Sequence, residues 1–227
     1  IFNEKSVDEL IIIDIDATVY GKEPNYTLIE KLANESRMPL CYGGGVKSVG
    51  QAEKIIQLGV EKISLSSAII QRPELIGELA EAVGSQSVVG VLDVKKSFFK
   101  GYEIYINNGR NKVKGTLINW IEKFQEYGVG EILFNSIEFD GMQGGYDLNF
   151  ATSVCSYLKV PVTYLGGAGS LEDIGGLVEN FGVIGCAAGS LFVFKGKYRA
   201  VLINYPSFDE KYSLLTKCLH IYNNNAV

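Results

Sequence analysis

Residues Leu40–Ser67 read LCYGGGVKSVGQAEKIIQLGVEKISLSS, a pattern of strand, glycine turn, helix, second strand and small polar turn. The same parts return in the same order over Val162–Ser190, which reads VTYLGGAGSLEDIGGLVENFGVIGCAAGS. Ser67 matches Ser190 at an offset of 123 residues (190−67), and glycines and a valine match at the same offset. Solenoid repeats recur every ~20–50 residues, so a period this long predicts a duplicated half-domain.

The repeat extends upstream, where Val7–Ile13 matches Val129–Phe134, so each half holds at least three strand–helix steps. The second half has one more strand, Ser87–Val94 (SVVGVLDV), before these steps. Its counterpart in the first half would fall before residue 1, so we expect the first strand to be absent from this sequence. Strands that alternate with helices predict a parallel sheet. Four steps in each half predict a (β/α)8 TIM barrel with two pseudo-symmetric halves, a single N-terminally incomplete domain over residues 1–227.

Composition excludes several classes of protein. Hydrophobic residues make up 47% of the chain, but we find no apolar run long enough to span a bilayer and no visible signal peptide. The four cysteines are scattered without a CxxC pair, which indicates reduced thiols in a cytoplasmic protein. A net charge of −5 gives no support for nucleic-acid binding. We expect neither a metal nor an organic cofactor.

Glycines, serines and aspartates follow the predicted strands, at the carboxyl edge where barrels of this class carry their function. Glycines after strands can be tight turns only, but here two glycine turns and two small polar turns recur at matched offsets. Glycine lets the backbone approach an oxyanion, and amides at helix N-termini donate to it. Two such turns on opposite sides of the mouth predict a long substrate with a phosphate at each end. The residues concerned are Asp14, Gly43–Gly45, Ser66, Ser67, Asp93, Asp140, Gly141, Gly166–Gly169, Gly189 and Ser190.

Asp93 ends the apolar strand Val88–Leu92, so its carboxyl group should point into the barrel mouth. Partial desolvation there favours the neutral form and suits a general acid or base. The alternative is that Asp93 pairs with Lys95 or caps the following loop. Phe98–Thr116 alternates apolar and polar residues around an Asn-Asn-Gly turn, which predicts a β-hairpin inserted after this strand.

Taken together, these residues resemble the cyclase subunit of imidazole glycerol phosphate synthase, HisF, and its sister isomerase of histidine biosynthesis. The resemblance covers nearly the whole chain and is carried by VDELIIIDIDAT, the GGG turn, EKISLSSA, GSQSVVGVLDVK, GVGEILFNSIEFDG, GYD and GGAGS. It implies an ammonia-dependent lyase and cyclase. A partner glutaminase (HisH-like) would supply ammonia, which would pass through the barrel centre to a doubly phosphorylated substrate.

The resemblance also implies roles for individual residues. Asp93 matches a catalytic aspartate and Asp14 a polar active-site position, whereas the second catalytic aspartate belongs to the strand that this sequence lacks. One phosphate site maps to Gly45, Ser66 and Ser67, and the other to Gly141, Gly167, Gly189 and Ser190. Glu9, Lys62 and Glu131 match a charged ring that admits ammonia at the barrel floor, and Glu61 matches a glutaminase contact. Ordinary solvated surface charge is the alternative for these four.

Some positions depart from the histidine enzyme. Ser66 stands where that enzyme has Asn, Asn135 where it has Thr, Leu165 where it has Ser and Asp16 where it has Thr. The segment LFVFKGKYRAVLINYPS, residues 191–207, looks like a paralogous group that adds acetamidino nitrogen to nucleotide-linked surface-polysaccharide sugars. A phosphosugar isomerase barrel that needs no partner and a non-catalytic binding barrel are further alternatives.

Overall fold

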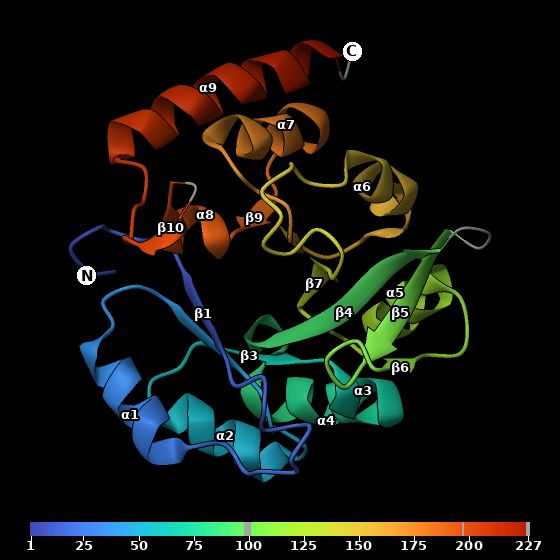
Figure 1. Ribbon diagram of the computed structural model, residues 1–227. Coiled ribbons are helices and arrows are strands. Elements are labelled where there is room, and N and C mark those ends of the chain that lie inside the picture. Colours follow the sequence, from blue (N-terminus) through green and yellow to red (C-terminus); the bar gives the residue numbers. More distant parts are fainter. Residues whose placement is uncertain (98–100, 197, 226–227) are drawn as a thin grey trace.

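A curled parallel β-sheet covered by helices forms the protein (Figure 1), of which the computed structural model describes residues 1–97, 101–196 and 198–225. The parallel strands follow the order β1-β2-β3-β4-β7-β8-β9, as in a (β/α)8 barrel. Their bounds are β1 (Leu10–Ile13), β2 (Leu40–Gly43), β3 (Lys62–Leu65), β4 (Val88–Ser97), β7 (Glu131–Ser136), β8 (Val162–Leu165) and β9 (Gly185–Ala187).

Helices lie on the outside of this sheet and leave its concave side to the barrel interior. They are α1 (Tyr26–Glu35), α2 (Val49–Gln57), α3 (Ser67–Gln71), α4 (Glu74–Val83), α5 (Leu117–Glu126), α6 (Leu148–Val154), α7 (Leu171–Phe181), α8 (Ser190–Val193) and α9 (Phe208–Asn225). Two single-turn 3₁₀ helices cover Ser85–Ser87 and Cys155–Tyr157. Ser48 caps helix α2, because its side chain accepts a hydrogen bond from the Gln51 backbone N–H.

The strands are rich in apolar residues because both faces of most of the sheet are covered. Successive side chains alternate between the faces. Ile63 and Phe134 pack outward against the helices, whereas Cys41, Val89 and Leu133 form a small inner core. Alternate residues of one strand therefore pack either against the helices or into the barrel interior.

The two halves match, as the repeat predicts. Gly43 ends β2 and Gly166 follows β8, so both lie at the carboxyl edge of the parallel sheet. Helix α3 begins at Ser67 and helix α8 at Ser190, the pair that defines the 123-residue offset.

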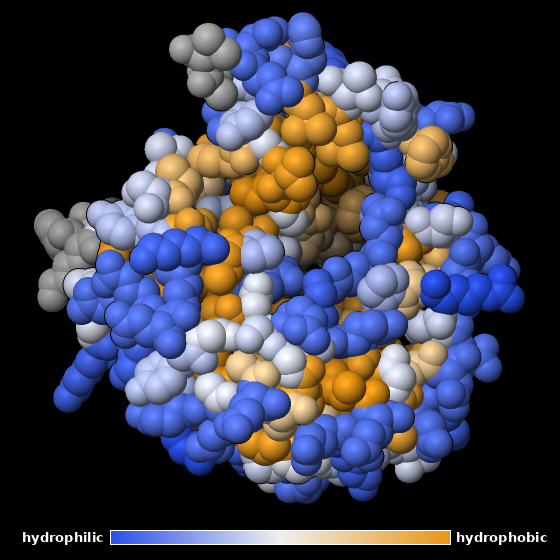
Figure 2. Space-filling model, turned by 180° about the vertical axis from the view of Figure 1, so that it is seen from behind, coloured by the Kyte–Doolittle hydropathy of each residue, from blue (hydrophilic) through white to orange (hydrophobic). Residues whose placement is uncertain are grey.

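The edges of the sheet are β1 and β9, which do not pair with each other in the described parts of the chain. Between them lies a cavity of about 1070 Å³ that includes the interior side chains Ile11 and Leu165. Its walls also hold residues of α7 and α9, and an apolar hollow opens on the face shown in Figure 2. The side chains of Tyr205 and Lys211 bridge one end of the gap, where both bind the carboxylate of Asp8.

One sequence-based boundary needs correction. Strand β4 runs to Ser97 rather than ending at Leu92, because beyond the barrel it pairs antiparallel with β5 (Gly101–Ile106). The predicted hairpin is confirmed as β5 and β6 (Asn111–Lys112), while its first residues, 98–100, lie outside the described residues. The segment after α8 is a short hairpin, β10 (Phe194–Lys195) with β11 (Ala200–Val201).

All four cysteines are free. Cys41 and Cys218 are buried, but Cys155 is exposed, so burial does not hold for every thiol. Burial raises the pKa of Cys41 to about 12, which keeps this interior thiol protonated.

Candidate active site at the mouth of the barrel

Asp93 lies at the centre of the carboxyl edge, on the face of β4 that also carries Val89 and Val91 into the interior. Asn135 of β7 donates a hydrogen bond from Nδ2 to Asp93 Oδ1 at 2.8 Å. The Ser66 hydroxyl, which follows β3, donates to Asp93 Oδ2 at 3.1 Å. Three adjacent strands thus hold one carboxylate from both sides.

Burial raises the pKa of Asp93, and the hydrogen bonds from Asn135 and Ser66 partly oppose that rise. A carboxyl group whose pKa is raised in this way takes up a proton more readily than a solvated one, which suits a general acid or base. The alternative pairing with Lys95 is wrong, since Lys95 Nζ instead lies 3.9 Å from Glu138 Oε1.

The first predicted phosphate site lies beside Asp93. Ser67 is buried at the first turn of α3, and its Oγ accepts a hydrogen bond of 3.2 Å from the Asn107 backbone N–H at the hairpin tip. Gly45 has a φ of +75°, and a Cβ there would lie 2.8 Å from the Lys22 carbonyl oxygen. The loop therefore requires glycine at this position. The Gly45 N–H points to Thr18 Oγ1 at 3.5 Å, so loop residues occupy part of this site.

The second predicted phosphate site gathers at the other half of the edge. A Cβ on Gly141 would lie 3.5 Å from Ser190 Oγ, which places these two residues side by side. At Gly167, φ is +111° and a Cβ would collide with the Gly145 carbonyl, whereas one at Gly189 would meet open space.

Arg199 is a residue of this second site that sequence reasoning missed. Its guanidinium donates from Nη2 to the Gly141 carbonyl oxygen, and so brings a fixed positive charge beside Ser190. Guanidinium groups bind phosphate with paired N–H donors. No spacing pattern could have shown it, because Arg199 reaches the site from the β10–β11 hairpin.

The charged residues predicted for the floor come together at the amino edge. Lys62 Nζ lies 3.1 Å from Glu9 Oε1 and 2.9 Å from Glu131 Oε2, and the Thr163 hydroxyl donates to Glu131 Oε1 at 2.6 Å. Burial lowers the pKa of Lys62, but the two glutamates outweigh it and hold that pKa above its usual value. Glu61 stands apart from this cluster, with its carboxylate accepting from the Leu40 backbone N–H at 2.6 Å.

Asp14 occupies a turn after β1 rather than a place beside Asp93. Its Oδ1 accepts hydrogen bonds of 3.1 Å from the backbone N–H groups of Asp16 and Ala17. The geometry gives Asp14 a role in shaping this turn, and its catalytic role stays a prediction. An Asp14→Asn variant tests it, because the amide oxygen can still accept both bonds.

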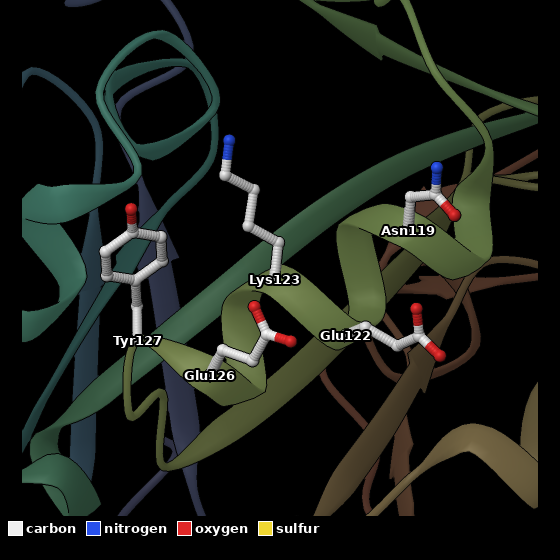
Figure 3. A pocket seen from close by; sticks show the side chains of 5 residues that line it. All are labelled: Asn119, Glu122, Lys123, Glu126 and Tyr127. Atoms are coloured by element: carbon white, nitrogen blue, oxygen red, sulfur yellow. The ribbon is translucent and has the colours of Figure 1, made fainter.

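A second depression, of about 480 Å³, lies on the outer face of α5 (Figure 3). All of its lining residues come from the one helix and the residue after it. Tyr127 donates to Glu74 Oε1 at 3.2 Å, an ordinary contact of solvated helix faces. The side chains that line this depression do not point toward a common centre (Figure 3), so we place the candidate site at the barrel mouth. The lining residues are Asn119, Glu122, Lys123, Glu126 and Tyr127.

The fold and the polar mouth at its carboxyl edge together define a (β/α)8-barrel enzyme. The family model described as "Histidine biosynthesis protein" matches residues 1–199. A protein of Vibrio vulnificus (strain YJ016), named provisionally imidazole glycerol phosphate synthase subunit hisF3, is 53% identical over 93% of this chain and 82% of its own length. A similarly named Leptospira borgpetersenii protein is 51% identical over 94% and 85%.

The imidazole glycerol phosphate synthase subunit HisF of Clostridium botulinum (strain Kyoto) is 37% identical over 86% of this chain and 77% of its own length. The chain therefore belongs to the histidine biosynthesis family, within its HisF group. Among residues 1–97, 101–196 and 198–225, no three His, Cys, Asp or Glu side chains are grouped so as to hold a metal ion. In the same residues no helix has the length and apolar character needed to cross a membrane.

Proposed function

We propose that this chain is the cyclase subunit of an imidazole glycerol phosphate synthase, which joins ammonia to a doubly phosphorylated substrate. The observation that carries the proposal is Asp93, held by Ser66 and Asn135 at the carboxyl edge of the sheet that also carries the two glycine and serine turns. The matched turns would anchor the two phosphates, and this would hold the reacting centre over the carboxylate. Family membership and the subunit names of the relatives support it.

Proton transfer is the work that we assign to Asp93. Ring closure after attack by ammonia requires protons to be added and removed on the substrate. A positioned carboxyl group of raised pKa provides this exchange, typically worth 10²–10⁴-fold in rate. The phosphate anions would act in the same direction as burial, because negative charge nearby favours the neutral form of Asp93.

Ammonia would reach Asp93 from the opposite end of the barrel. The Glu9–Lys62–Glu131 cluster lies at the amino edge, and small interior side chains such as Cys41 and Ser64 separate it from the mouth. The interior is narrow at Gly43, because a Cβ there would collide with Ser64 Oγ. The absence of a side chain at this position therefore leaves room for a small molecule to pass. We propose that a glutaminase subunit docks on the amino edge, where Glu61 lies beside the start of β2.

The test is an assay of the protein with ammonium and the doubly phosphorylated ribonucleotide precursor, with imidazole glycerol phosphate detected by mass spectrometry. The expected result is product from the parent and at least a hundredfold less from Asp93→Asn. Failure of the parent to form any imidazole product would reject the proposal.

The second candidate is transfer of ammonia-derived nitrogen to a nucleotide-linked sugar. It is favoured by the relatives of about 50% identity, whose HisF names are provisional and in some cases numbered, and which resemble this chain more than the 37% relatives do. Formation of an acetamidino sugar with ammonium, and no imidazole product, would select it. Both candidates use the same ammonia path and the same Asp93.

A further inference from the structure

Only one of the two polar atoms of the Asn135 side-chain amide forms a hydrogen bond in the described structure. Its Nδ2 donates to Asp93, but its Oδ1 is buried and has no hydrogen-bond partner in the described structure. The orientation of the amide follows from the carboxylate, because the reverse orientation would set one oxygen against another. Asp93 therefore fixes Oδ1 as an unpaired acceptor at the barrel mouth.

An unpaired buried acceptor lowers stability, and proteins keep such groups mainly where function needs them. The other unpaired buried atom in the described residues, the Tyr164 hydroxyl, lies elsewhere. Its ring sits among Phe134 and Phe150 on the helix side of the sheet, within an aromatic cluster. Only Asn135 belongs to the inner face, two positions after the interior residue Leu133.

We propose that Asn135 determines substrate specificity: its Oδ1 accepts a hydrogen bond from an N–H or O–H group on the substrate segment between the two phosphates. This inference rests on the proposed function, whose product carries an imidazole N–H next to its glycerol phosphate chain. A ligand that lacks a donor there leaves Oδ1 unpaired and is bound less well, since a site built to pair with a donor rejects analogues without it.

The same amide links recognition to Asp93. Nδ2 helps keep Asp93 ionised, so Oδ1 presents an acceptor while the carboxylate is ready to take a proton. Ser66 also donates to Asp93, so the carboxylate keeps one of its two hydrogen bonds when the Asn135 amide is removed.

The experiment measures the affinities of the protein for imidazole glycerol phosphate and for glycerol phosphate by calorimetry. The ratio of the two dissociation constants cancels effects on phosphate binding. The variants are Asn135→Leu, which keeps the volume, and Asn135→Ala, which leaves space; binding of glycerol phosphate shows that a variant is folded. Asn119→Leu, the same change at an exposed position on the outer face of α5, is the matched control.

We expect the parent to prefer imidazole glycerol phosphate, and both Asn135 variants to lose about tenfold of that preference, the worth of one hydrogen bond. Asn119→Leu should keep the ratio within about threefold of the parent. If the Asn135 variants keep the parent ratio, this inference alone is overturned. If the parent itself shows no preference, the proposed function fails and this inference falls with it.

Discussion

The two ends of the barrel interior hold carboxylates in opposite ways. At the mouth, Asp93 receives hydrogen bonds from two neutral groups, and its pKa is raised. At the floor, the carboxylates of Glu9 and Glu131 share the ammonium group of Lys62, whose own pKa is raised. Burial pushes the carboxyl group at the mouth toward its neutral form, whereas the carboxylates at the floor are paired with a cation.

The difference comes from which strand partner stands beside each carboxylate. Alternation along β4 and β7 brings Asp93 and Asn135 to one level of the interior, since the two are register partners in the parallel pair. Four residues earlier on β7, the same alternation brings Glu131 to the floor, within reach of Lys62 on β3. One pattern of side chains thus builds a titratable centre and a fixed ionic cluster at opposite ends.

The largest effect should come from removing the titratable group at the mouth. Asp93→Asn keeps the size and the contacts to Ser66 and Asn135 but ends proton exchange. We expect turnover with ammonium to fall by roughly 10²–10⁴-fold, with substrate affinity little changed. Steady-state kinetics measures both, and Asp16→Asn, an exposed change near the mouth, is the control. If Asp93→Asn turns over substrate at nearly the parent rate, Asp93 is not the general acid or base, and the contrast between mouth and floor no longer holds.

The next largest effect should come from the floor. Lys62→Met leaves Glu9 and Glu131 facing each other without a cation, and Glu131 is only 15% exposed. Breaking a buried pair costs ~3–5 kcal/mol, and partial exposure reduces this, so we expect a loss of about 1–3 kcal/mol in unfolding free energy. Urea denaturation measures it against Lys31→Met, an exposed helix position.

The pH dependence of the floor follows from the raised pKa of Lys62. Its stabilising contribution is complete below the unfolded pKa, about 10.4, and is lost only as pH rises through the higher folded value. The difference between the parent and Lys62→Met should therefore be constant around neutrality and shrink in strong alkali. A difference no larger than that of Lys31→Met would mean that the cluster is ordinary surface charge.

The repeat made most of this arrangement predictable. A shared offset placed Gly43 and Gly166 at one edge, and the strand pattern placed Asp93 there too. Lys62 and its two glutamates could not be paired from spacing, because they lie 53 and 69 residues apart in sequence. Only the resemblance to a known family suggested that they form one cluster.

What sequence reasoning missed depends on contacts between distant elements. Strand β4 continues past Leu92 because β5 offers a new antiparallel partner there, which strand propensity does not report. Arg199 reaches Gly141 from another hairpin, and the unpaired oxygen of Asn135 is visible only once its neighbours are placed. These features are properties of register and packing rather than of local pattern.

A smaller effect should distinguish the two phosphate sites. Ser190→Ala should weaken inorganic phosphate binding by about tenfold, because a hydrogen bond to an anion contributes ~1.5 kcal/mol or more. Ser67→Ala should weaken it less, since inorganic phosphate should prefer the site where Arg199 adds a guanidinium beside Ser190. Calorimetry tests this against Ser153→Ala, whose hydroxyl bonds the Phe150 carbonyl instead. Equal losses at both serines would show that the sites do not differ in this way.

The smallest effect concerns the stability of the mouth. The folded-state pKa of Asp93 is raised, so its contribution favours folding below the unfolded pKa, about 3.9, and is lost as pH rises through the folded value. Because Asn does not ionise, Asp93→Asn does not lose this stability as pH rises. We expect the variant to be about as stable as the parent at pH 4 and more stable by about 1 kcal/mol or less at pH 7. The gain is limited because Ser66 and Asn135 already stabilise the ionised carboxylate. Thermal unfolding across this pH range, with Asp16→Asn as control, measures the difference between the two curves. A variant that loses stability relative to the parent as pH rises would show that the hydrogen bonds outweigh burial, and that the mouth holds its charge as firmly as the floor does.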